Sequence, residues 1–173
     1  MAPLSNFRRP PVGGARRRIR ADGRETQSVT ETANLSGIKV MVIDDSNTIR
    51  RSAEIFLVQA GCKVILAEDG FDALAKITDH QPDVIFCDIM MPRLDGYQTC
   101  ALIKNHTEFK ATPVVMLSSK DGLFDRARGR MVGSDQYLTK PFTKESLLKA
   151  VATHVKARTP ADGAPAAAAK LTG

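Results

Sequence analysis

The sequence predicts an α/β fold, a doubly wound open sheet of five parallel strands with five helices. Short apolar runs alternate along the chain with segments whose apolar residues have helical spacing. Gly, Pro and Asp lie at the junctions between these segments. Runs of this kind are typical of strands that are buried on both faces, and their regular alternation with helices indicates repeated βα units.

The first unit illustrates the pattern. Its strand is expected at residues 38–43, and Ser46 is placed to cap the helix that follows. Gly61 can end that helix, because glycine adopts the left-handed conformation of a C′ residue at little cost. Apolar side chains recur between these two residues with the spacing of one helical face, at Ile49, Ala53, Phe56 and Ala60.

The other four units follow the same logic. Helices are expected to begin at Asp69-Gly70, at Asp95-Gly96 and after Thr143, and prolines precede the third and fourth strands. The remaining strands are expected at residues 63–67, 84–87, 114–117 and 136–139. The helices after the second, fourth and fifth strands carry apolar residues at Leu74 and Ile77, at Leu123, Ala127 and Met131, and at Leu147, Leu148, Val151 and Val155.

Acidic residues close two of the expected strands. Asp44 and Asp45 follow the first strand, and Asp88 follows the third. The order 2-1-3-4-5, which we take from the flavodoxin-like fold, would place these two strands side by side with their carboxyl ends at one edge. Three carboxylates in one pocket repel one another unless protons or a hard cation neutralise them, and oxygen ligands suit Mg2+. The arrangement indicates phosphate chemistry.

The net charge of +6 lies in the two ends of the chain. Residues 1–37 carry seven Arg against three acidic residues, whereas residues 38–155 have equal numbers of each sign. Composition predicts a disordered basic tail over 1–36, one domain over 37–156 and a disordered Ala/Pro-rich tail over 157–173. Residues 1–28 are open to three interpretations: an arm for RNA, lipid or an acidic partner, a segment without function, or translated upstream sequence before a start at Val29.

Other residues that could carry chemistry lack the required spacing. The three cysteines have no C-x-x-C pattern and are expected to be structural, and the three histidines lack ligand spacing: Cys62, Cys87, Cys100, His80, His106 and His154. A glycine-rich phosphate loop is absent from the sequence, so ATP is not an expected substrate. No apolar stretch reaches the ~18 residues of a membrane span, and no secretory signal precedes the domain, which predicts a cytoplasmic protein without membrane insertion.

Several of these motifs together resemble the response-regulator receiver domain over residues 38–155. The matching elements are Val42–Ser46, Asp88–Gly96, Ser118 at the end of the fourth strand and Lys140–Phe142 after the fifth. More narrowly, the stretches 39–51, 88–104 and 116–142 resemble receivers that regulate twitching motility by type IV pili.

The resemblance implies a role for each residue of the acidic pocket. Asp88 would be the phosphoacceptor, and Asp44, Asp45, Asp88 and the backbone carbonyl of Met90 would hold Mg2+. Lys140 would contact the phosphoryl group. These are the groups that the reaction needs, because charge spreads over the phosphoryl oxygens when a carboxylate attacks a phosphohistidine.

The resemblance also implies a switch and an access path. Ser118 would hydrogen-bond the phosphoryl group, and Tyr137 would turn inward and repack the surface of the fourth helix, fifth strand and fifth helix. The alternative for Tyr137 is an ordinary edge-strand residue. Met90, Ser119 and Lys120 would flank the path of water to the acyl phosphate and thereby set the rate of dephosphorylation.

Only eighteen residues follow Val155, too few for a DNA-binding or enzymatic output domain. A stand-alone response regulator without turnover of an external substrate is therefore expected. Its partners would be a chemotaxis-like histidine kinase or phosphotransfer domain and a downstream protein effector, expected to be pilus machinery, and not DNA. The alternative is a small Mg2+-dependent phosphohydrolase with an aspartyl phosphate, but the family of that kind requires Asp-x-Asp after its first strand.

Overall fold

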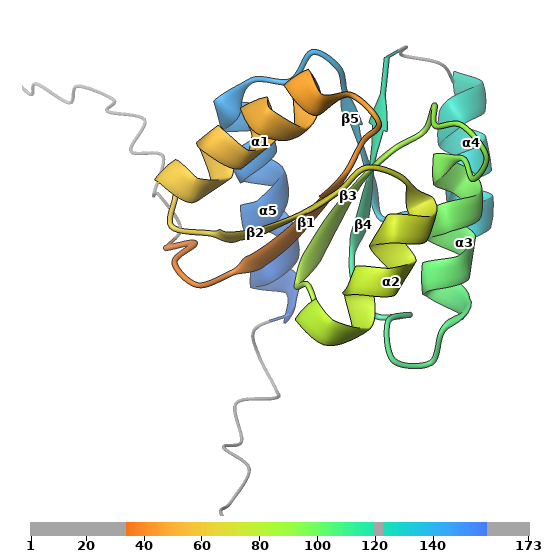
Figure 1. Cartoon of the computed structure of the whole chain (residues 1–173), viewed down its shortest axis with the longest axis horizontal. Coiled ribbons are helices and arrows are strands. Elements are labelled where there is room, and N and C mark those ends of the chain that lie inside the picture. The colour runs from red at the N-terminus through yellow and green to blue at the C-terminus, as the bar shows by residue number, and fades with distance from the viewer. Residues whose placement is uncertain (1–33, 120–122, 159–173) are drawn as a thin grey trace, which may run out of the picture. The chain divides into compact units, whose positions relative to one another are not determined.

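The computed structural model describes residues 34–119 and 123–158 (Figure 1). The strands are β1 (Lys39–Ile43), β2 (Lys63–Ala67), β3 (Val84–Asp88), β4 (Val114–Ser118) and β5 (Gln136–Thr139). The helices are α1 (Asn47–Gln59), α2 (Gly70–His80), α3 (Gly96–Asn105), α4 (Leu123–Val132) and α5 (Lys144–Arg158). Lys120 and most of the two predicted tails lie outside the described residues. Within these ranges, no helix has both the length and the apolar character needed to cross a bilayer.

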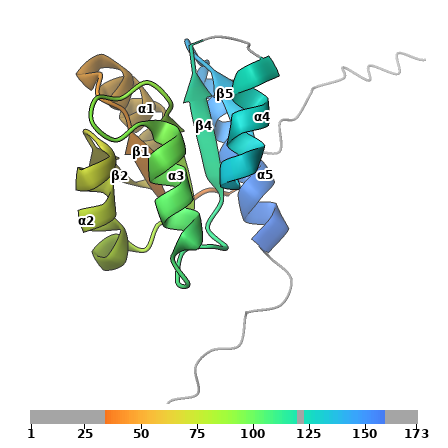
Figure 2. The same cartoon turned by 90° about the vertical axis from the view of Figure 1, so that its right-hand side faces the viewer.

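The five strands form one parallel sheet in the order β2-β1-β3-β4-β5, which confirms the predicted fold and strand order. Helices α1 and α5 cover one face of the sheet, and α2, α3 and α4 cover the other, as Figures 1 and 2 show. Because all the strands are parallel, every βα connection leaves the sheet at the same edge. This edge contains the carboxyl ends of β1 and β3.

Two apolar cores lie on the two faces of the sheet. Side chains alternate along a strand, so Met41 and Ile43 of β1 belong to the core under α2, α3 and α4, whereas Val40 and Val42 belong to the core under α1 and α5. All four are fully buried. Burial on both faces explains why the strands are continuously apolar rather than alternating.

Capping residues begin the helices where the sequence predicts them. The side chain of Ser46 accepts a hydrogen bond from the backbone of Ile49, and Asp69 and Asp95 begin α2 and α3 in the same way. Thr143 Oγ1 accepts from the backbone N–H of Ser146 at the start of α5. These side chains satisfy backbone donors that have no partner within the helix.

Helix α4 does not bury all of the apolar residues that mark it in the sequence. Met131 is 87% exposed, and Ala127 is also exposed. Instead Gly129 is buried and Val132 packs against the core. The reason lies in β5: the ring of Tyr137 occupies the space that a Cβ at Gly129 would need, so α4 approaches the sheet through a residue without a side chain.

All three cysteines are buried, and none of them forms a disulfide. Burial raises the pKa of the Cys87 thiol well above its ordinary value and that of Cys100 to about 11. A thiol with a raised pKa is a poor nucleophile and metal ligand. The cysteines therefore behave as small apolar side chains, as the sequence predicts.

Candidate functional site

Three carboxylates meet at the carboxyl edge of the sheet. Asp44 and Asp45 follow β1, and Asp88 is the last residue of β3. The register pairs Ile43 with Cys87, which brings the next residue of each strand together. One ligand oxygen from each carboxylate lies within 4.8 Å of the others. The structure thus brings together the acidic residues that the sequence predicts for this pocket.

The three carboxylates differ in exposure. Asp44 and Asp88 are buried, at 0% and 2% exposed, whereas Asp45 is exposed. The side chain of Asp44 accepts a hydrogen bond from the backbone of Ser46 at 2.8 Å, so the cap of α1 also orients this carboxylate. The pocket therefore has a buried floor and one acidic side that faces solvent.

Lys140 inserts its ammonium between the two buried carboxylates. Its Nζ lies 2.9 Å from Asp88 Oδ1 and 3.1 Å from Asp44 Oδ2, and its side chain is 16% exposed. The backbone N–H of Lys140 donates to the carbonyl oxygen of Ser118 at 2.6 Å, and the bond to Pro141 is cis. The lysine that follows β5 therefore reaches across β4 to the ends of β1 and β3.

One ammonium does not neutralise this cluster. Burial raises the pKa of Asp88, and although Lys140 opposes that effect, the neighbouring charge of Asp44 adds to it. Burial would lower the pKa of Lys140, yet its hydrogen bonds to Asp88 and Asp44 raise the pKa instead. The raised pKa of Lys140 keeps this side chain protonated, and the raised pKa of Asp88 shows that the ammonium compensates the carboxylate charge only in part. A pocket in this state favours the binding of a further cation.

Four of the five other predicted site residues lie in the described part of the chain. Ser118 is buried at the end of β4, and Ser119 beside it is exposed. Tyr137 is half-buried on β5 and lies against Gly129 of α4. Met90, in the loop after β3, is 73% exposed. Lys120 lies outside the described residues, so its predicted place beside the pocket stays a prediction.

A groove of about 470 Å3 opens beside the acidic pocket. Arg128 of α4 lies over the ring of Tyr97 in α3, with 4.8 Å between the guanidinium carbon and the ring centroid. The lining residues are Asp45, Ile89, Met90, Met91, Pro92, Asp95, Tyr97 and Arg128. The groove therefore runs along the loop that carries Met90 to the exposed carboxylate of Asp45.

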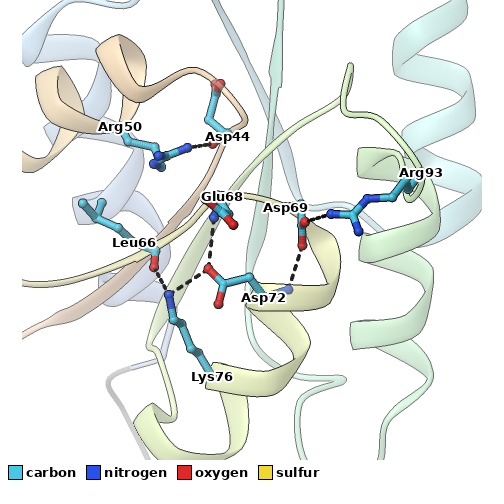
Figure 3. Close-up of polar contacts among 8 residues, drawn as sticks. All are labelled: Asp44, Arg50, Leu66, Glu68, Asp69, Asp72, Lys76 and Arg93. Carbon is cyan, nitrogen blue, oxygen red and sulfur yellow. Dashed lines mark hydrogen bonds and ion pairs between the residues drawn. The ribbon is translucent and has the colours of Figure 1, made fainter.

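Two arginine contacts near the pocket could not be predicted from the sequence. Arg50 Nη1 donates to the carbonyl oxygen of Asp44 at 2.6 Å, and Arg93 pairs with Asp69 (Figure 3). Arginines on a helix or in a loop are usually solvated, so neither their type nor their spacing indicates these partners. Only the folded arrangement brings them together.

Comparison with known proteins adds independent observations. The family model for the response regulator receiver domain matches residues 40–152. The chain is 72% identical to protein PilG of Pseudomonas aeruginosa over 126 residues, which cover 73% of this chain and 93% of PilG. It is 36% identical to the response regulator MprA of Mycolicibacterium vanbaalenii, over 76% of this chain and 56% of that protein.

Solved structures show the same relationship. The chemotaxis protein CheY4 of Vibrio cholerae is 35% identical, with a TM-score of 0.65 over 67% of this chain and 97% of that one. The receiver domain of the Francisella response regulator 1452 is also 35% identical, with a TM-score of 0.65 over 70% and 98% of the two chains. The match covers the folded part of the chain in each comparison.

Proposed function

The chain belongs to the response regulator receiver domain family, and on this premise we propose that phosphorylation of Asp88 switches it between two states that bind a protein effector differently. A receiver domain is a signalling domain rather than a catalytic enzyme, and it implies a histidine kinase as a partner. The observation that carries the proposal is the cluster of Asp44, Asp45 and Asp88 with Lys140 in contact with two of them.

In the proposed reaction the carboxylate of Asp88 attacks the phosphorus of a phosphohistidine. A new O–P bond forms and the P–N bond to imidazole breaks, and the ring leaves as neutral imidazole when its other nitrogen carries a proton. Lys140 is already 2.9 Å from Asp88, close enough to balance the charge that spreads over the phosphoryl oxygens. Its contact with Asp44 holds the ammonium in place before phosphate arrives.

The donor set fits a magnesium ion. Asp44, Asp45 and Asp88 offer three carboxylate oxygens within 4.8 Å of one another, and Met90 would add its backbone carbonyl. When bound, Mg2+ would supply positive charge to the carboxylates and to the transferred phosphoryl group. The exposed side chain of Asp45 leaves a solvent route to this side of the pocket.

The switch would run from Ser118 to Tyr137. Ser118 is the last residue of β4, and Tyr137 lies on the neighbouring strand β5, where it pairs with Met116 of β4. Tyr137 also packs on Gly129 of α4. A phosphoryl group that hydrogen-bonds Ser118 would shift the equilibrium between two arrangements of the surface formed by α4, β5 and α5. That surface would bind the effector.

We also propose the biological setting. The identity of 72% to PilG, together with the stretches that resemble twitching-motility receivers, supports a role in type IV pilus twitching motility. The kinase would be of the chemotaxis-like kind, or a phosphotransfer domain, and the effector would belong to the pilus machinery. The domain would act in the cytoplasm through contact with proteins and not with DNA.

Labelling with radioactive acetyl phosphate tests the function. With Mg2+ present, we expect one phosphoryl group per chain, and the label should be lost with hydroxylamine, which cleaves acyl phosphates. A chelator should abolish labelling. Turnover of generic phosphate monoesters, measured as released phosphate at many equivalents per chain, would instead indicate the phosphohydrolase.

The exposed side chain of Met90 provides a prediction about the lifetime of the phosphoryl group. An apolar side chain cannot orient the water that attacks an acyl phosphate, whereas an amide can. We expect Met90→Asn to shorten the lifetime roughly tenfold, a modest effect for positioning a proton-transfer group. Decay of the radiolabel measures it, and Met131→Asn, a change at another exposed methionine, is the control. A lifetime equal to that of the parent would rule out the proposed role of Met90.

A further inference from the structure

The loop between β3 and α3 carries Met90 and is closed tightly at its base. The backbone N–H of Gly96 donates to the carbonyl oxygen of Ile89 at 3.0 Å, and Ile89 donates to Leu117 of β4 at 3.1 Å. A Cβ at Gly96 would collide with the backbone of Asp88, so the base tolerates no side chain at this position. These hydrogen bonds therefore fix Ile89 and Gly96 at the base of the loop. They do not fix the residues between them.

Arg93, at the tip of the loop, makes contacts outside the loop. Its guanidinium pairs with the carboxylate of Asp69 (Figure 3). The guanidinium carbon also lies 5.7 Å from the ring centroid of Phe71. The backbone of Arg93 has a φ of 67°, in the left-handed region, and Gln81 is the only other non-glycine residue with positive φ in the described part of the chain. A side chain other than glycine keeps this conformation where the surrounding contacts require it.

The partner of Arg93 is itself held firmly. Asp69 is the N-cap of α2, and its other carboxylate oxygen accepts the backbone N–H of Asp72 at 2.8 Å. Its side chain is 11% exposed. Next to it, a Cβ at Gly70 would collide with the side chains of Leu94 and Thr99, so the loop and α3 pack directly on the start of α2.

Hydrogen bonds from Lys76 and Glu68 also stabilise the turn between β2 and α2. Lys76 Nζ donates to the carbonyl oxygen of Leu66 at 2.8 Å and to Asp72 Oδ2 at 2.7 Å, and the backbone N–H of Glu68 donates to the same Asp72 oxygen at 3.1 Å (Figure 3). These bonds connect the strand, the turn and the first turns of the helix. Asp69 therefore offers Arg93 an anchor that does not depend on the loop.

From these contacts we propose that the Arg93–Asp69 pair is a positioning pair that holds the backbone of Met90 in place for Mg2+. Arg93 is three residues beyond Met90 in the same short loop, and neither residue of the pair touches the three clustered carboxylates in any contact described above. The inference rests on the proposed function, because it concerns the affinity of the same cation site. Partners of this kind, outside the ligands themselves, commonly change metal affinity when they are removed.

The test is the dissociation constant for Mg2+, measured by isothermal titration calorimetry on the full chain. Arg93→Asn removes the guanidinium while keeping a residue that tolerates the left-handed region. We expect the Kd to rise about tenfold, at the low end for such partners. Arg51→Asn is the matched control, because Arg51 pairs with Glu54 on α1 and its loss changes the net charge equally. Its Kd should stay at the parent value or fall.

The loss of the positive charge of Arg93 by itself would lower the Kd for Mg2+ or leave it unchanged. A weaker affinity in Arg93→Asn therefore has to come from the loop. In an Asp69→Asn background, where asparagine still caps α2, adding Arg93→Asn should change the Kd no further. With radioactive acetyl phosphate, the Mg2+ concentration for half-maximal labelling should rise, while labelling at saturating Mg2+ should equal that of the parent.

Three outcomes decide between the possibilities. A raised Kd in Arg93→Asn but not in Arg51→Asn, with full labelling at saturating Mg2+, supports the positioning role. An unchanged Kd with a lower urea midpoint overturns it, because the pair then only stabilises the fold. Absence of Mg2+ binding and labelling in the parent chain overturns the proposed function, and the positioning role with it.

Discussion

Asp88→Asn is expected to abolish phosphoryl incorporation from acetyl phosphate, to the level measured without protein. The asparagine amide is not a nucleophile, and no other carboxylate in the pocket has the same placement: Asp44 is buried at 0% exposed and accepts from Ser46, and Asp45 faces solvent. Labelling at saturating Mg2+, followed by a filter or gel measurement, gives the result directly.

The same variant should be more stable than the parent at neutral pH. Burial and the charge of Asp44 raise the pKa of Asp88, so its ionised form destabilises the folded state. That cost is fully present above the raised pKa and disappears as the pH falls below the ordinary pKa of an aspartate, because the folded state binds the proton more tightly. Asp88→Asn removes the cost, by about 1 kcal/mol for a buried charge of this kind. The gain should shrink on acidification.

Urea denaturation at several pH values measures this gain, with Asp79→Asn on the exposed end of α2 as the control. Retention of labelling in Asp88→Asn would contradict the assignment of the phosphoacceptor. A loss of stability at neutral pH would contradict the electrostatic interpretation and leave the assignment unaffected, because the two measurements are independent.

Lys140→Met is expected to lower the free energy of unfolding by about 3 kcal/mol, because it leaves two buried carboxylates without their cation. The side chain of Lys140 is 16% exposed, and those of Asp44 and Asp88 are 0% and 3% exposed, so water compensates little for the loss. Methionine has a similar length, which limits any change in packing. Labelling by acetyl phosphate should also fall sharply, because the group that balances phosphoryl charge is absent.

Two comparisons separate this effect from a general loss of structure. Lys144→Met, at an exposed lysine that contacts Gln59, should change stability by less than about 0.5 kcal/mol. In an Asp88→Asn background the cost of Lys140→Met should be smaller, because fewer charges are left unpaired. Equal costs in the two backgrounds would show that Lys140 stabilises the fold by some route other than this carboxylate.

Local patterns in the sequence were sufficient to predict the strands, the helices and the acidic residues of the pocket. The five strands and the caps at Ser46, Asp69, Asp95 and Thr143 follow from apolar runs and capping chemistry, which depend on residues close together in sequence. The approach of Asp44 and Asp45 to Asp88 also needed the strand order 2-1-3-4-5, which was taken from the flavodoxin-like fold and which the structure confirms. The assignment of Lys140 came from the resemblance to receiver domains, since lysine by itself is usually a surface residue.

Only the tertiary structure showed how separate helices, strands and loops pack against one another. The buried side of α4 includes Gly129, which lies against Tyr137 of β5, whereas the apolar residues Ala127 and Met131 are exposed. Arg93 meets Asp69 across two loops that are distant in sequence. The physical reason is that helical or strand periodicity depends on neighbours within a few residues, whereas the docking of one element on another depends on the shapes and charges of both.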